Sequence, residues 1–244
     1  MSIQVDLLKD TQAYTIPPIV AGTQPTRIVE GYPQTARRTP SRALLRRPLT
    51  LSELTGPLDL SSRLAATSAD VAGQGAERAQ GQLILLRLAV RDEDGSPIAG
   101  TMVEMWQANA AGHYAHPNDS DHAPLDPHFH GNARVRTDAS GNIEIRTIKP
   151  GAYPVPGPDR WWRPPHVHFS VWGKVWLSRV VTQMFFPGDP LNEQDLIFNA
   201  VTNAEARARL VARSVPTRAA PSDALVFEHT LVVRGKHATP AEHA

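Results

Sequence analysis

The pattern of apolar and polar residues changes at about residue 82, where short runs with a period of two follow a stretch without regular periodicity. In the clearest run, Ile143 and Ile145 share one face while Glu144 and Arg146 share the other, as in a half-buried strand. The segments with a strand pattern are residues 82–90, 101–108, 133–138, 143–148, 166–173, 178–186 and 225–234. Turns rich in Gly, Pro and Asp separate them, so the pattern predicts an all-β fold, an antiparallel β-sandwich.

Helical signals are few. Residues 204–212 fit one short helix with Asn203 as its N-cap. Thr50 and Glu53 fit a capping box, which predicts a second short helical turn. The sandwich is therefore expected to carry one or two short helices.

The connections between the strands differ in length. The turn at 139–142 is short and predicts a hairpin between 133–138 and 143–148. The loops 109–132 and 149–165 are long, and long loops on a β scaffold tend to carry function. We therefore look for chemistry in these two loops.

The first third of the chain is rich in Pro, Thr, Arg and Gly and has an arginine-rich stretch at 37–47. This composition predicts an extended N-terminal arm that faces solvent or another subunit. We accordingly divide the chain into an arm, residues 1–80, which packs on the core or on a partner subunit, and a β-sandwich domain, residues 81–244, which carries the chemistry.

Charge and composition exclude several classes of function. Lys and Arg number 25 against 24 Asp and Glu, so no excess of positive charge indicates nucleic-acid binding. The absence of Cys excludes disulfides, thiolate nucleophiles and Cys-ligated metal sites. The apolar run 83–90 is interrupted by Arg87 and is far shorter than the roughly 20 residues of a membrane span, and residues 1–10 lack a secretory pattern. We expect no membrane association and a cytoplasmic protein.

Two His-x-His pairs are candidates for a metal site. His166 and His168 lie on a predicted strand, so both imidazoles project from one face and can reach one ion. His128 and His130 have the same spacing in a loop that also holds other His and Asp residues. Either pair could instead be polar surface residues, and spacing alone does not decide between them.

Longer motifs add a resemblance. GHYAHPND (112–119), KPGAYP (149–154) and WRPPHVHF (162–169) occur in this order, with SELTGPLDL (52–60) before them and TQMFFPGDPL (182–191) after them. Together these segments resemble the intradiol ring-cleaving dioxygenase family from about residue 50 to residue 236. Within the family the chain is most similar to the iron-bearing beta subunits of the protocatechuate-cleaving branch.

The resemblance implies one Fe³⁺ per chain, held by Tyr114, Tyr153, His166 and His168. Tyr114 and His166 would be equatorial, Tyr153 and His168 axial, and hydroxide would take the fifth position. Fe³⁺ is a hard acid that suits phenolate oxygen. Tyr153 is the ligand implied to leave and act as a base. The pair in the 109–132 loop matches no ligand position and is then interpreted as loop.

The resemblance also assigns the residues around the substrate. Arg163 is implied to stabilise negative charge on the substrate, and Gln183 to hydrogen-bond around the ring. The further substrate-binding candidates are Tyr32, Arg38, Val155 and Ile197. Val155 departs from the family pattern, because protocatechuate enzymes usually carry a large aromatic residue there, and a smaller side chain reshapes the pocket.

The implied activity is cleavage of protocatechuate (3,4-dihydroxybenzoate) with O₂ between its hydroxylated carbons, giving 3-carboxy-cis,cis-muconate. The implied partner is a homologous alpha subunit that completes the active site. Cleavage of catechol, hydroxyquinol or another substituted catechol is the alternative, although relatives of that kind usually begin with a helical dimerisation domain and residues 1–80 are rich in Pro. A non-catalytic β-sandwich binding subunit is the alternative from a different class.

Overall fold

The computed structural model describes residues 20–42, 65–73, 75–117, 119, 122–155, 161–172, 179–216 and 223–242. The predicted helical turn at Thr50 lies outside these residues, as do Arg46 and Arg47 of the arginine-rich stretch. No helix of the described chain is long and apolar enough to cross a membrane.

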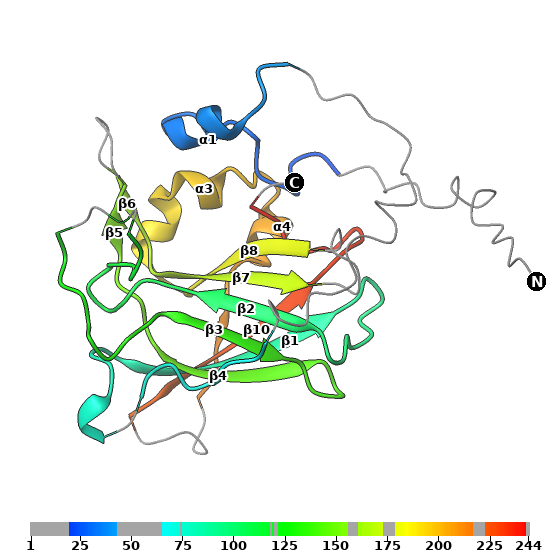
Figure 1. Ribbon diagram of the computed structural model, residues 1–244. Coiled ribbons are helices and arrows are strands. Elements are labelled where there is room, and N and C mark those ends of the chain that lie inside the picture. Colours follow the sequence, from blue (N-terminus) through cyan, green and yellow to red (C-terminus); the bar gives the residue numbers. More distant parts are fainter. Residues whose placement is uncertain are drawn as a thin grey trace, which may run out of the picture.

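Two four-stranded sheets form the molecule, and this confirms the predicted β-sandwich. The first sheet has the order β4-β1-β10-β9 and the second the order β3-β2-β7-β8. Figure 1 shows the sheets stacked, with the short helices gathered at one end. The strands of the first sheet are β1 (Leu83–Arg91), β4 (Asn142–Ile148), β9 (Arg213–Ser214) and β10 (Leu225–Val232). The strands of the second are β2 (Met102–Trp106), β3 (Asn132–Arg136), β7 (His166–Trp172) and β8 (Arg179–Phe185).

The remaining elements are short. A third, two-stranded sheet pairs β5 (Tyr153–Pro154) with β6 (Trp162–Arg163). The helices are α1 (Pro33–Arg38), α3 (Leu196–Asn199) and α4 (Ala204–Ala208), with 3₁₀ turns η2 (Gly75–Glu77) and η3 (Pro190–Gln194).

The hydrophobic core lies between the two large sheets. Alternate residues of each strand point inward, and because β7 runs between β2 and β8 it is buried along almost its whole length. Val167 and Phe169 are fully buried in this core, which leaves His166 and His168 on the opposite face of β7. The core is completed by Ile84, Leu86, Leu88, Val103, Met105, Ile145, Met184, Phe186 and Leu231 among others.

Three details of the prediction were wrong. The strands β3 and β4 belong to different sheets, so the tight turn at Asp138–Asn142 leads from one layer to the other and is no hairpin. The strands β1 and β10 pair in parallel, as an exception in an otherwise antiparallel arrangement. The helix predicted to reach residue 212 ends at Ala208, because Val211 forms a bridge with Phe185 of β8.

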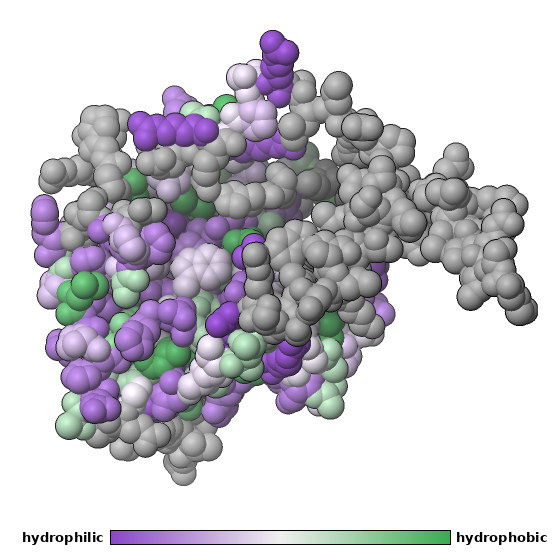
Figure 2. All heavy atoms as spheres, viewed as in Figure 1, coloured by the Kyte–Doolittle hydropathy of each residue, from purple (hydrophilic) through white to green (hydrophobic). Residues whose placement is uncertain are grey.

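Segment 20–42 packs against the helical end of the sandwich. Asn203 donates its backbone N–H to Gly22, and Ala241 donates to the Gln24 side chain at 2.6 Å. In Figure 1 this segment, with α1, lies over α3 and close to the last residues of the chain. Hydrophilic residues cover most of the described surface in Figure 2, with hydrophobic ones in small separate groups.

Candidate metal centre

Four side chains from β7 and the two long loops converge on one point. The His166 Nε2 atom lies 3.2 Å from His168 Nε2, 3.3 Å from Tyr153 Oη and 3.5 Å from Tyr114 Oη. In the described chain no three His, Asp or Glu side chains form a metal-binding group, so the tyrosine oxygens supply half of this donor set. Two phenol oxygens and two imidazole nitrogens are a combination that fits a hard transition-metal ion such as Fe³⁺.

Close loop packing brings the two tyrosines together. Gly112, at φ +87°, precedes Tyr114 by two residues, and a Cβ atom there would collide with the Ala152 carbonyl beside Tyr153. Only glycine tolerates both this backbone conformation and this contact. Asp119 accepts a hydrogen bond from the Tyr114 backbone N–H at 2.8 Å and so fixes the loop on the other side. The tyrosine rings meet edge to face, with centroids 5.5 Å apart.

The histidine rings are held in one orientation. His166 Nδ1 donates to the Pro164 carbonyl at 2.7 Å, and His168 Nδ1 donates to Glu242 Oε1 at 2.6 Å. Each Nδ1 is thus engaged, which leaves each Nε2 facing the point of convergence. Burial, together with the positive charge of Arg163, holds the pKa of His166 well below its usual value. Its ring is therefore neutral near pH 7 and has a lone pair available for a metal.

The phenol groups depend on a cation for deprotonation. Burial and the neighbouring Tyr153 raise the pKa of Tyr114 well above its usual value. Burial also raises the pKa of Tyr153, although the Arg163 guanidinium opposes this shift. Both phenols are protonated at neutral pH unless a bound cation supplies the opposite charge.

Arg163 brings a fixed positive charge to the site. It is 3% exposed, donates from Nε to Asp195 Oδ2 at 2.8 Å and from Nη2 to Gln183 Oε1 at 2.6 Å. Burial alone would lower its pKa, but the Asp195 carboxylate together with Tyr153 and Tyr114 outweighs burial and raises the pKa. Asp195 also caps α3 by accepting hydrogen bonds from Ile197 and Phe198. The sequence did not single out Asp195, although its position before a short apolar helical segment is an N-cap signal.

A cavity of about 570 Å³ opens beside these groups. Of the predicted residues, those that line it are Tyr153, Arg163, His168, Gln183, Tyr32 and Ile197. Arg27 and Glu242, which sequence reasoning missed, line it as well. Val155 is buried but is not among the lining residues, and the Arg38 side chain lies outside the described part of the structure.

Trp161 contributes an aromatic ring next to this cavity. Its ring lies edge to face with Tyr32, at a centroid distance of 5.9 Å, and 6.0 Å from the Arg163 guanidinium carbon. An aromatic residue thus contacts the site from position 161 rather than from Val155. No motif in the sequence distinguished Trp161 from the exposed Trp162 beside it.

The other His-x-His pair does not form a metal site. Phe129 between the two histidines is buried in a small apolar cluster, and both His128 and His130 are exposed. The buried Phe129 ring thus holds this loop on the core, while the imidazoles on either side are exposed to solvent.

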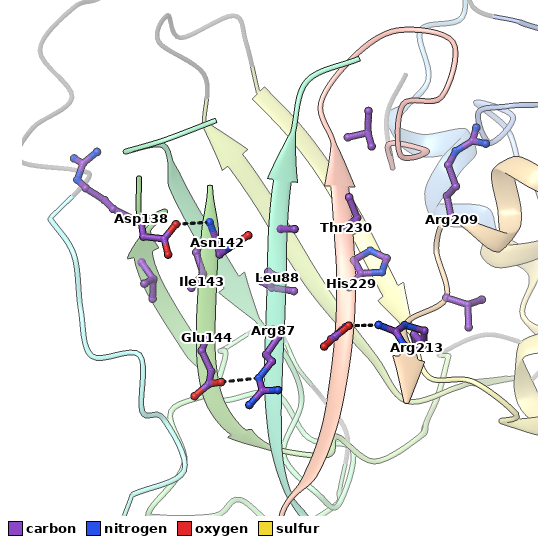
Figure 3. Close-up of a pocket in the computed structure, with 16 residues that line it drawn as sticks. Arg87, Leu88, Asp138, Asn142, Ile143, Glu144, Arg209, Arg213, His229 and Thr230 are labelled. Atoms are coloured by element: carbon purple, nitrogen blue, oxygen red, sulfur yellow. Dashed lines mark hydrogen bonds and ion pairs between the residues drawn. The ribbon is translucent and has the colours of Figure 1, made fainter. Parts of the chain in front are cut away.

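A larger cavity, of about 900 Å³, lies on the first sheet around β4, β1 and β10. Four of its charged side chains form two ion pairs, Arg87 with Glu144 and Arg213 with Glu228 (Figure 3). None of the described residues that line it is a tyrosine, and His229 is the histidine among them. The cavity of about 570 Å³, which is lined by Tyr153, Arg163 and His168, is therefore the candidate functional site.

Known proteins match this chain over most of its length. A family model described as a dioxygenase matches residues 54–235. The beta chain of protocatechuate 3,4-dioxygenase from Burkholderia cepacia is 40% identical over 222 residues, covering 90% of this chain and 94% of that one. Catechol 1,2-dioxygenase 2 from Acinetobacter lwoffii is 32% identical over 157 residues, covering 57% of this chain and 55% of that one.

A solved structure agrees with these matches. The 3-chlorocatechol 1,2-dioxygenase of Rhodococcus opacus 1CP has a TM-score of 0.52 and 25% identity, covering 68% of this chain and 64% of that one. An intradiol ring-cleavage dioxygenase from Tetranychus urticae, 20% identical with a TM-score of 0.51, shares the fold and covers 69% of this chain and 86% of that one. The matches in sequence and fold show that the chain belongs to the intradiol ring-cleaving dioxygenase family.

Proposed function

We propose that this chain cleaves protocatechuate with O₂ between its two hydroxylated carbons, giving 3-carboxy-cis,cis-muconate. The observation that carries the proposal is the convergence of Tyr114, Tyr153 and His168 within 3.5 Å of His166 Nε2, next to a cavity. Enzymes of this family generally depend on non-heme iron. We assign one Fe³⁺ per chain to these four side chains.

When bound, Fe³⁺ would act as a hard Lewis acid toward the catechol oxygens and would activate the ring toward O₂. A catechol loses protons on binding, and a residue of the protein must accept at least one of them. Tyr153 lines the cavity, whereas Tyr114 is not among the lining residues. Tyr153 is thus the phenolate that a substrate can reach, and we assign it the role of proton acceptor, with Tyr114 as the ligand that stays in place.

We propose that Arg163 stabilises negative charge on the substrate ring. Arg163 lines the cavity, and its hydrogen bonds to Asp195 and Gln183 fix the orientation of the guanidinium. A charge that is already oriented requires no reorganisation when charge develops during the reaction. Gln183 also lines the cavity and would hydrogen-bond around the oxygenated ring.

The cavity can recognise a carboxylate. Arg27 and Tyr32 line it, and a cation together with a hydroxyl donor is a suitable pair for the substrate carboxylate. We propose Arg38, which lies at the end of α1, as a further cation, and Ile197 as an apolar wall. The name of the relative from Burkholderia cepacia, a protocatechuate enzyme, supports this substrate.

A catechol without a carboxylate is the second candidate. Val155 leaves the site without the large aromatic side chain expected at that position, and relatives named for catechol and hydroxyquinol also match the chain. Arg27 would then have no partner on the substrate.

A homologous alpha chain is the proposed partner. The relative that matches 90% of this chain is itself named a beta chain, which implies at least one other chain type in that enzyme. We propose that the arm, residues 1–80, contributes to this association, and that residues 81–244 form the catalytic domain.

The experiment is oxygen uptake by the purified, iron-loaded chain, with and without a co-expressed alpha chain. Protocatechuate should be turned over faster than catechol or hydroxyquinol, and mass spectrometry should identify 3-carboxy-cis,cis-muconate. Faster turnover of catechol would overturn the substrate assignment. Absence of a red-brown tyrosinate absorption band after iron loading would overturn the metal site.

A further inference from the structure

Glu242 makes a direct contact with a candidate iron ligand from a distant part of the chain. Its Oε1 atom accepts a hydrogen bond from His168 Nδ1 at 2.6 Å, across 74 residues of sequence. The two side chains are 13% and 15% exposed, so bulk water screens this contact only weakly. No motif predicted it, because Glu242 lies outside the matched region 54–235.

The segment that carries Glu242 is docked by hydrogen bonds on three sides. Thr239 exchanges two hydrogen bonds with Val232 at the end of β10, both at 2.9 Å. Along β8, the Glu242 backbone N–H donates to Val181 at 2.8 Å. The remaining contacts are Thr182 Oγ1 to the Pro240 carbonyl and the Ala241 N–H to Gln24 Oε1, both at 2.6 Å. These hydrogen bonds fix the backbone of the segment, and the fixed backbone holds the Glu242 carboxylate next to His168.

His168 is held from a second direction by an aromatic ring. The Trp106 ring lies 4.8 Å from the His168 ring at an interplanar angle of 8°. Stacking restricts tilt, and the Glu242 bond restricts rotation within the ring plane. With Nδ1 committed to the carboxylate, the His168 Nε2 atom points at the Tyr114–Tyr153–His166 cluster.

The two histidines differ in their partners. His166 donates to the neutral Pro164 carbonyl, whereas His168 donates to a carboxylate. A carboxylate behind a metal-bound imidazole raises its basicity more than a carbonyl does, and removal of such a partner typically costs about 10- to 100-fold in metal affinity. The two imidazole rings therefore differ in the acceptor that binds Nδ1, and we expect His168 to be the more basic of the two donors.

We propose that Glu242 is a positioning residue for His168, which fixes the tautomer and orientation of that ring and tightens metal binding at its Nε2 atom. The inference rests on the proposed function, since it takes His168 to be an iron ligand. If so, segment 239–242 helps to position one of the proposed iron ligands.

The test compares three variants of the full chain with the wild type: Glu242→Gln, Glu242→Ala and Glu205→Gln. Glu205 is an exposed carboxylate in the first turn of α4 and serves as the control. Iron affinity is measured by competition with a chelator, and the position of the tyrosinate absorption band is recorded. Thermal unfolding of each metal-free protein reports on folding.

We expect Glu242→Ala to lose about 10- to 100-fold in iron affinity and to shift the absorption band. Glu242→Gln keeps an acceptor and the backbone contacts, so it should unfold at the wild-type temperature and still bind iron more weakly. The Glu205→Gln control should match the wild type in all three measurements.

The inference is overturned if Glu242→Ala keeps wild-type iron affinity and an unshifted band, a result that leaves the proposed function intact. It is also overturned if the loss of affinity in both Glu242 variants follows only from a lower unfolding temperature. A wild-type chain that takes up no iron overturns the proposed function as well, so the two failures are distinct.

Discussion

Arg163 and Asp195 form a buried ion pair whose two members have separate tasks. Asp195 is fully buried, and it both neutralises Arg163 and caps α3. A buried charge that loses its partner costs about 3–5 kcal/mol of stability, far more than a surface ion pair contributes. The positive charge of Arg163, to which we assign the stabilisation of charge on the substrate, is therefore neutralised by a residue that does not line the cavity.

Replacing Asp195 should reveal this cost. Asp195→Ala leaves the Arg163 charge buried without its carboxylate and removes the cap, so the free energy of unfolding should fall by about 3 kcal/mol or more. Urea denaturation measures it. Glu193→Ala, two residues earlier and exposed, is the matched control and should change little. Equal losses in the two variants would contradict the interpretation.

The proposed iron ligands can be distinguished from other His residues by substitutions with a matched control. Tyr114→Phe and His168→Ala should each lose iron or most activity, because each removes one of the four donors. His128→Ala has the same His-x-His context but an exposed ring, and it should keep both. Iron content per chain and oxygen uptake are the measurements. A comparable loss in His128→Ala would mean that the loop pair holds the metal.

At the scale of elements, strand β7 and two loops build the centre by different means. The alternation of β7 places both imidazoles on one face, which the sequence pattern predicts directly. The loops bring in the tyrosines through glycine contacts that no periodicity reveals. Only the family motifs pointed to Tyr114 and Tyr153.

The contact at Gly112 gives a prediction at this scale. Gly112→Ala forces a Cβ against the Ala152 carbonyl, in addition to the strain of a positive φ. Gly95→Ala has nearly the same φ, +84°, but meets no atom within 4 Å, so it measures strain alone, about 1–2 kcal/mol. The Gly112 variant should lose more stability on thermal unfolding and also bind iron more weakly. Equal behaviour of the two variants would contradict this packing role.

Local patterns predicted most strands but not how the strands are ordered. The run 133–148 has the alternation and the tight turn of a hairpin, yet β3 and β4 belong to separate layers, because the Asp138 turn sits at a corner of the sandwich. The Glu242 contact and the Arg163–Asp195 pair depend on packing across 74 and 32 residues of sequence. Such contacts follow from topology, which alternation and turn signals do not specify.

At the scale of the whole molecule, one buried histidine makes stability depend on pH. His229 is 5% exposed, its Nε2 has no hydrogen-bond partner within the described structure, and burial lowers its pKa to about 4. Because the unfolded chain takes up a proton near pH 6.5 and the folded chain does not, stability is lost as the pH falls from about 6.5 to about 4. The loss from this group is at most about 3 kcal/mol.

His229→Leu should therefore flatten the fall in unfolding free energy between pH 6.5 and pH 4. The exposed His237 is the matched control, and His237→Gln should keep the wild-type slope. Urea denaturation of the metal-free proteins at several pH values measures the slopes. An unchanged slope in His229→Leu would show that other groups carry the acid sensitivity.

The parallel pair β1–β10 has a consequence for the order in which the molecule forms. Gln82, just before β1, donates to the Asp223 carbonyl, just before β10, across 141 residues of sequence. Contacts between such distant segments close late and make folding slow. The first sheet is incomplete until β10 has been synthesised, and the segment with Glu242 follows β10. The His168–Glu242 hydrogen bond therefore cannot form before β10 and the segment that follows it have been synthesised.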